Sequence, residues 1–260
     1  TGKKFLLFYC KAFLFNRCFL FNCYFGLGQS YFALEFGDST LNETAKAVFP
    51  MDDGTVYLAG FTETNNTAVD FCLLKLSNDG HVIWQKQFGT VTDDFLERSS
   101  YDAAAGCFYL LGGTKQAGSS NYDGALAKVD TAGNLIWWRN YGEVAGNESF
   151  YGIDRLSTGE LVLGGIVNSS QQPQNNVELI KTDTAGNLIW SKRFGEPNKE
   201  EVLTAVVVDE SDNIYLSLDE KLAIDFYNAA VLKTDSSGNE LWWWQSQWPY
   251  NSGTKNILLG

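Results

Sequence analysis

A polar residue recurs five positions after the glycine of each aromatic-glycine pair in this chain. The four residues are Asn42, Asp94, Asn147 and Glu200. Carboxylate and amide oxygens bind hard cations and the hydroxyl groups of sugars, so a ring of these side chains could hold either ligand. The alternative, which the pattern favours, is that each side chain satisfies local backbone groups at the start of a strand, since no dense acidic calcium loop accompanies them.

Residues for other kinds of chemistry are sparse. The only histidine, His81, follows a turn where the other units carry asparagine, so it does not indicate a Ser-His-Asp site. Cys72 and Cys107 lie at different places in the repeat, and no Cys-x-x-Cys pair exists, which argues against a zinc site and favours two separate buried thiols. We therefore expect no metal and no cofactor, and we expect binding rather than catalysis. A glycosidase pair of carboxylates would not be recognisable from spacing.

A twelve-residue motif predicts the elements that would position these residues. It occurs four times, as LLKLSNDGHVIW, LAKVDTAGNLIW, LIKTDTAGNLIW and VLKTDSSGNELW. The tryptophans that close it are Trp84, Trp137, Trp190 and Trp242. A period near 50 residues is typical of solenoids, propellers and arrays.

Each unit contains four short runs rich in aromatic and β-branched residues, separated by Gly, Asp, Asn and Ser, as expected for strands and turns. In the first unit they are Ala45–Phe49, Thr55–Phe61, Asp70–Leu76 and Val82–Gln87. No apolar stripe of helical period competes with them. Four antiparallel strands in about 50 residues make a propeller blade. The sequence therefore predicts an all-β propeller.

Four complete blades and part of a fifth follow from this period. Their approximate ranges are 37–88, 89–141, 142–194, 195–247 and the partial 248–260, within a propeller domain at 29–260. Residues 30–37 resemble the last strand of a unit. A propeller that closes by combining strands from both termini in one blade would use such a strand. We predict an incomplete ring that needs further blades downstream, and a closed four-blade ring is the alternative.

The motif itself predicts a tight turn and a tryptophan ring that packs against a neighbouring blade. Glycine supplies the positive φ of the turn, while Asp or Ser caps free backbone NH groups. The tryptophan is expected to pack between neighbouring blades, where burial of its large ring stabilises the assembly. The turn glycines are Gly80, Gly133, Gly186 and Gly238.

Specific binding is expected where the four copies differ. The connections after the second strand vary in length and sequence, and they lie on the same face as the connections between blades. They are Thr62–Val69, Thr114–Tyr122, Asn168–Asn175 and Leu218–Tyr227. Tyr122 and Tyr227 are therefore candidate ligand contacts. The alternative is that these are tolerated solvent loops without a ligand.

The first 28 residues differ in composition from the rest. They hold four basic residues, no acidic one, and many Phe, Leu and Cys, and they end on Gly26-Leu27-Gly28. This pattern predicts a cleaved signal peptide at 1–28 and a secreted or cell-surface protein. The basic and Asn residues within it argue against a membrane anchor. The net charge of −12 disfavours nucleic acid and anionic membranes as partners.

The unit resembles the bacterial β-propeller repeat often labelled SBBP. The residues that carry the resemblance in the first unit are Phe36-Gly37, Asp53-Gly54, Tyr57, Gly60, Asp70, Leu73, Lys75, Gly80 and Trp84. The resemblance covers about 30–260. It implies a secreted or surface-exposed protein of a family whose members often carry a sorting domain for type IX secretion. The turn and tryptophan also resemble the docking motif of quinoprotein-type propellers, without implying their cofactor.

These observations together predict a non-catalytic binding or structural module. Its expected partner is a polysaccharide or another surface protein. The alternatives are a propeller enzyme, such as a polysaccharide hydrolase or lyase with its site at the channel mouth, or an envelope-assembly propeller.

Overall fold

The computed structural model describes residues 10–15, 18–23, 43–63, 68–143, 146–169, 176–195, 199–223, 226–246 and 250–251. These residues form β-strands, turns and links, and no helix among them is long and apolar enough to cross a membrane. A separate hairpin near the N-terminus pairs β1 (Cys10–Phe15) with β2 (Cys18–Cys23). The segment 30–37, predicted to be an orphan fourth strand, lies outside the described residues.

Four antiparallel sheets follow one another along the chain, each built from consecutive strands. Sheet one contains β3 (Glu43–Pro50), β4 (Val56–Glu63), β5 (Val69–Leu76) and β6 (Val82–Phe88). Sheet two contains β7 (Asp94–Asp102), β8 (Cys107–Lys115), β9 (Tyr122–Asp130) and β10 (Leu135–Tyr141). Sheet three contains β11 (Gly146–Arg155), β12 (Leu161–Ser169), β13 (Asn176–Thr182) and β14 (Leu188–Phe194). Sheet four contains β15 (Glu200–Val208), β16 (Ile214–Ala223), β17 (Phe226–Thr234) and β18 (Glu240–Gln245), and the short β19 (Tyr250–Asn251) also pairs with β17.

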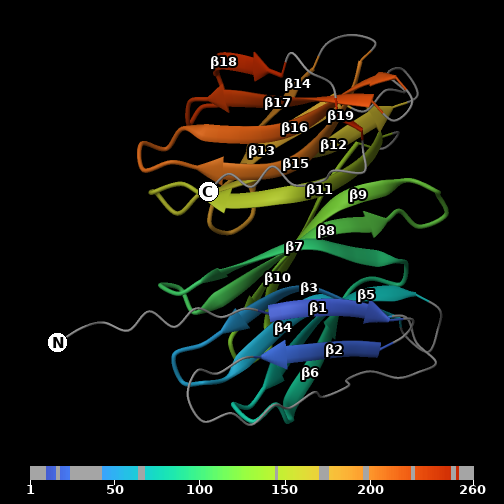
Figure 1. Cartoon of the computed structure of the whole chain (residues 1–260), viewed down its shortest axis with the longest axis vertical. Helices are drawn as coiled ribbons and strands as arrows, with labels where there is room; N and C mark the ends of the chain where they lie inside the picture. The colour runs from blue at the N-terminus through green and yellow to red at the C-terminus, as the bar shows by residue number, and fades with distance from the viewer. Residues whose placement is uncertain are drawn as a thin grey trace.

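The predicted all-β architecture of four-stranded antiparallel sheets is thus confirmed. The sheets are stacked in chain order, from blue at the bottom to red at the top of Figure 1. The first strand of each later sheet packs on the sheet before it: β7 on sheet one, β11 on sheet two and β15 on sheet three. The fourth strands form the outer edges and are more exposed than the second and third strands. This is the arrangement of successive propeller blades.

The core is divided into layers between neighbouring sheets. Tyr57 and Phe71 of sheet one meet Phe108 of sheet two, and Tyr57 and Phe108 have ring centroids 4.7 Å apart. Phe150 of sheet three is buried against sheet two, and aliphatic side chains fill the layer between sheets three and four. Apolar residues on both faces of the second and third strands contact the sheets on either side, which explains why these strands hold most of the buried residues.

The predicted turn glycines have the expected backbone conformation. Their φ angles are 85° at Gly80, 81° at Gly133, 78° at Gly186 and 73° at Gly238. In the third unit, Oδ1 of Asp183 accepts hydrogen bonds from the backbone NH groups of Ala185 and Asn187, at 2.9 and 2.8 Å. A hydrogen bond from the side-chain amide of Asn187, together with these two, holds the pKa of Asp183 below its usual range.

Each of the first three tryptophans lies against the turn glycine of the following sheet. A Cβ placed on Gly133 would lie 3.0 Å from Cη2 of Trp84, and one on Gly186 would lie 2.9 Å from Cη2 of Trp137. Trp190 meets Gly238 in the same way, at 2.8 Å. The glycine therefore serves two purposes: it adopts a positive φ, and it leaves room for the ring of the preceding sheet.

This double role predicts a graded cost of substitution. Gly186→Ala would combine a left-handed backbone with a contact to Trp137, so we expect unfolding free energy to fall by about 2–3 kcal/mol. Gly106 also has a positive φ, 60°, but no atom lies within 4 Å of its added Cβ, so Gly106→Ala should cost only about 1 kcal/mol. Urea unfolding of the two variants measures the difference. Equal losses would contradict the docking contact.

Candidate functional site

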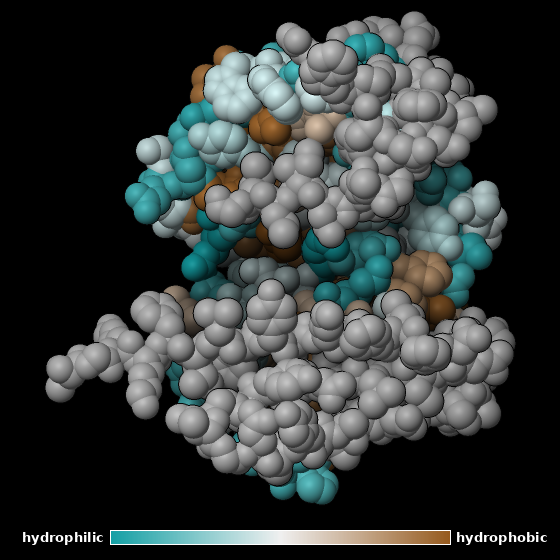
Figure 2. All heavy atoms as spheres, in the orientation of Figure 1, coloured by the Kyte–Doolittle hydropathy of each residue, from teal (hydrophilic) through white to brown (hydrophobic). Residues whose placement is uncertain are grey.

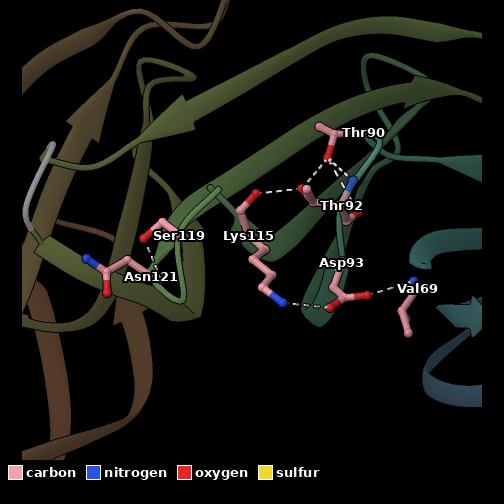
Figure 3. Close-up of polar contacts among 7 residues, drawn as sticks. All are labelled: Val69, Thr90, Thr92, Asp93, Lys115, Ser119 and Asn121. Carbon is pink, nitrogen blue, oxygen red and sulfur yellow. Dashed lines mark hydrogen bonds and ion pairs between the residues drawn. The ribbon is translucent and has the colours of Figure 1, made fainter. Parts of the chain in front are cut away.

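The link between sheets one and two, residues 89–93, lies beside the start of β5 and the end of β8. Figure 3 shows how the link between sheets one and two is held there. The Asp93 carboxylate accepts a hydrogen bond from the backbone NH of Val69 at 3.3 Å and faces Nζ of Lys115 at 3.6 Å. The Thr92 hydroxyl donates to the carbonyl oxygen of Lys115 at 2.5 Å. These contacts fix the link against the sheets on both of its sides.

Three aromatic side chains lie in a row beside this link, and we name them the aromatic path: Phe61 of β4, Phe95 of β7 and Tyr122 of β9. The rings of Phe61 and Phe95 meet edge to face with centroids 5.6 Å apart, and the centroids of Phe95 and Tyr122 are 6.0 Å apart. All three side chains are half-buried. The path therefore runs from sheet one to sheet two through three residues that are not fully buried.

Charged groups border the aromatic path. Nζ of Lys46 lies 5.7 Å from the ring centroid of Phe61 and 2.8 Å from Oε2 of Glu97. Lys46 belongs to β3 and Glu97 to β7, so this ion pair also spans sheets one and two. Figure 2 shows a surface hollowed between the lower and upper sheets, with hydrophilic residues beside the hollow. Aromatic faces next to hydrogen-bonding groups are a common composition for ligand sites.

The structure places the predicted polar ring residues in different surroundings. Asn147 accepts a hydrogen bond from the backbone NH of Tyr122 at 2.9 Å, which joins sheet three to the aromatic path. Glu200 pairs with Nζ of Lys221 at 2.6 Å. Asp94 is fully buried, and Tyr227 is half-buried in β17. Asn42 lies outside the described residues. Among the members of this set that the structure describes, Asn147 and Tyr122 are brought together by a hydrogen bond.

The strand register reveals an equivalent acidic position that counting from the glycine did not find. In the first strands, Glu43, Asp94, Glu148 and Glu201 pair with Thr62, Thr114, Val167 and Glu220 of the second strands. The link before Asp94 is one residue shorter than the other links, so a fixed count of five selects Asp94 but misses Glu148 and Glu201. The pairing partners, not the distance along the chain, identify the repeated acid.

Two of these acids share a small space with an acidic residue of the sheet before. A Cβ on Gly89 would lie 2.2 Å from Oδ1 of Asp70 and 2.6 Å from Oδ2 of Asp94. A Cβ on Gly142 would lie 2.3 Å from Oδ1 of Asp123 and 2.9 Å from Oε2 of Glu148. The glycine of the aromatic-glycine pair is thus required because it leaves room for two carboxyl groups.

Burial of these carboxyl groups favours their protonated form. Burial raises the pKa of Asp94, and burial together with the charge of Asp94 raises the pKa of Asp70. Burial, followed by the charges of Glu178 and Asp123, raises the pKa of Glu148 to about 7. Glu148 is 1% exposed, and no hydrogen bond reaches either of its carboxylate oxygens among the residues that the structure describes.

Metal and thiol chemistry have little support in the described part of the chain. No group of three or more His, Cys, Asp or Glu side chains is arranged there to hold a metal ion. Cys72 and Cys107 are both free, and burial raises the pKa of the Cys72 thiol to about 12. A thiol with such a pKa is a poor nucleophile at neutral pH.

Comparison with known proteins gives a fold but no family. No family model matches the chain, and no curated protein matches it. Among solved structures, a protein of unknown function from Dyadobacter fermentans is 13% identical, with a TM-score of 0.50 over 79% of this chain and 70% of that one. An α-L-arabinofuranosidase from Clostridium thermocellum is 11% identical, with a TM-score of 0.43 over 79% of this chain and 71% of that one.

These likenesses differ in what they support. The similarity to the Dyadobacter protein indicates a shared fold and carries no function. The similarity to the arabinofuranosidase is too low to transfer either its fold or its activity to this chain. The chemistry of the site must therefore be argued from its own residues.

Proposed function

We propose that this protein is a non-catalytic module that binds a neutral polysaccharide across sheets one and two. The observation that carries the proposal is the aromatic path of Phe61, Phe95 and Tyr122, which spans two sheets and consists of half-buried residues. The apolar C–H faces of sugar rings pack against aromatic rings, and neighbouring polar groups hydrogen-bond to the hydroxyls.

The charge of the protein supports a neutral ligand. A net charge of −12 repels anionic polymers, while sugar hydroxyls are indifferent to it. The ion pair of Lys46 and Glu97 beside the path supplies both donors and acceptors for hydroxyl groups. A polysaccharide has a repeated structure, so it can contact several rings in a row.

The carboxyl pairs give less support to a glycosidase. Hydrolysis needs two carboxyl groups that face a bound sugar from opposite sides of the scissile bond. Asp94 is 0% exposed and Glu148 is 1% exposed, so a sugar does not reach either of them in this conformation. Their position between sheets favours a structural role.

The location and the wider architecture belong to the same proposal. The basic and apolar composition of the first 28 residues and the acidic remainder support secretion or display at the cell surface. The resemblance to SBBP repeats supports the same location. The stacking of four successive sheets supports a propeller, with the ring completed by further blades.

Removal of the flat rings is expected to weaken polysaccharide binding while keeping the fold. Phe95→Leu and Tyr122→Leu retain apolar volume but lose the aromatic face, so affinity should fall at least tenfold, or about 1.4 kcal/mol, for each. A glycan array identifies the ligand, and calorimetry with that glycan compares the variants. Tyr101→Leu is the matched control, since Tyr101 lies on the same strand but packs against Phe49 and Phe108.

Three results would count against this function. A wild-type protein that binds no glycan, or variants that bind as well as wild type, would remove the role of the aromatic path. Release of new reducing ends from a bound polysaccharide would show catalysis and overturn the non-catalytic assignment.

A further inference from the structure

A tryptophan ring packs against the turn glycine of the next sheet three times. A fourth tryptophan lacks this contact among the residues that the structure describes. Trp84, Trp137 and Trp190 lie against the turn glycines of sheets two, three and four. The corresponding ring on sheet four, Trp242, is 44% exposed, and Trp244 two residues later is 53% exposed. An apolar edge of this kind usually marks an interface.

The side chains around Trp242 are arranged like those around the tryptophans that contact a turn glycine. Trp242 meets Tyr215 with ring centroids 6.1 Å apart, and Nζ of Lys233 lies 4.9 Å from the Tyr215 ring. On sheet two, Trp137 meets Tyr109 at 6.1 Å, and Nζ of Lys128 lies 5.2 Å from the Tyr109 ring. The local geometry that supports docking is therefore preserved on sheet four.

Position 244 differs from its counterparts in a way that enlarges this surface. The residues two positions after the first three tryptophans are Lys86, Arg139 and Lys192. Their stems also border the turn glycine of the next sheet: Cγ of Arg139, for example, would lie 2.9 Å from a Cβ on Gly186. Trp244 replaces this cation by an aromatic ring, which has more apolar surface to bury.

We propose that the outer surface of sheet four, formed by Trp242 and Trp244, docks a further four-stranded sheet of the same repeat. That sheet would place the glycine of its own Asp-x-x-Gly turn against the Trp242 ring. The inference continues an interface that the chain forms three times, and it is independent of polysaccharide binding.

A second copy of this chain is a poorer occupant because the four described Asp-x-x-Gly-type turns offer no open glycine. Gly133, Gly186 and Gly238 already lie against tryptophans, and Gly80 is buried as well. The partner must therefore be a sheet whose turn is still uncovered.

Oxidation of individual tryptophans by hydroxyl radicals, measured by mass spectrometry, tests this surface. In the unmodified chain, Trp242 and Trp244 should be oxidised faster than Trp190. A second copy of residues 195–247 is then inserted after Gln247, so that the rest of the chain is kept. The two copies of Trp242 fall in different tryptic peptides and can be followed separately. Oxidation of the original Trp242 should fall at least threefold, to the rate of Trp190.

The matched control carries Gly238→Val in the inserted copy alone, which blocks the ring contact while preserving the rest of the sheet. Oxidation of the original Trp242 should then stay at its unmodified rate. Equal protection with both insertions, or none with either, would overturn the proposal. So would a Trp242 that is already protected in the unmodified chain. Protection that grows with protein concentration, together with a dimer in sedimentation, would assign the surface to a second copy instead.

Discussion

Replacement of Gly112 by alanine is expected to lower the unfolding free energy by about 3 kcal/mol or more. Gly112 lies in β8, opposite the irregular register of β7 between Leu96 and Arg98. An added Cβ would lie 1.8 Å from the carbonyl oxygen of Phe95 and 3.0 Å from Cα of Leu96. Both are backbone atoms in a paired strand, so the contact is relieved only if β7 moves away from β8. Rotation of a side chain does not relieve this contact.

The neighbouring glycine supplies the control. An added Cβ on Gly113 would meet nothing closer than 3.6 Å, so Gly113→Ala should be neutral or slightly stabilising, because alanine loses less entropy than glycine in a strand. Urea unfolding followed by tryptophan fluorescence measures both variants. Gly112→Ala should also weaken glycan binding, since the displaced Phe95 belongs to the aromatic path. Similar stabilities for the two variants would show that β7 adapts freely.

The regular part of this fold was accessible from sequence because each element depends on local rules. Alternating apolar residues and Asp-x-x-Gly turns specify hairpins without reference to distant contacts, and a period near 50 residues repeats them. The residue that each tryptophan contacts depends less on local sequence. Trp137 meets Gly186 of the following sheet, and the repeat predicts such a contact only in general terms. The identity of the glycine, which is also the turn residue, required the structure.

The buried acids escaped prediction for a different reason. A fixed count from Gly142 selects Asn147, whereas pairing with Val167 shows that Glu148 is the equivalent of Asp94. One residue in a link reverses which side chain faces the core, because side chains alternate along a strand. Sequence periodicity tolerates such a shift, while the sheet does not.

The repeat pattern does not predict the aromatic path either. Phe95 aligns by strand register with Thr44, Ser149 and Val202 in the other sheets, so the ring is particular to sheet two. Phe61 aligns in the same way with Gly113. Variation between copies predicted the face on which to look, but the contact among three different strands comes only from the packing of sheets one and two.

Glu148→Gln is expected to stabilise the protein at pH 8 and to reduce its dependence on pH. The pKa of Glu148 is raised from 4.5 to about 7 on folding, so the folded protein holds this proton more tightly than the unfolded chain. Stability from this group is therefore complete below about pH 4.5 and is lost as the pH rises through about 7. Glutamine stays neutral throughout, so the gain at pH 8 should approach 2–3 kcal/mol and should vanish near pH 4.

A second acid of sheet three distinguishes this cause from a general effect of net charge. Glu160 lies 2.6 Å from Nζ of Lys181, and its pKa is lowered by the hydrogen bond with that lysine. Glu160→Gln removes the same single charge but also a favourable contact, so it should destabilise the protein by at most about 1 kcal/mol at pH 8. Urea unfolding at pH 5, 6, 7 and 8 compares the variants. If both substitutions stabilise the protein equally, relief of overall charge repulsion is the cause and Glu148 is not a special site. If only Glu148→Gln does so, the junction between sheets two and three is held most firmly when its carboxyl group is protonated, and Asp70 and Asp94 should act in the same direction between sheets one and two.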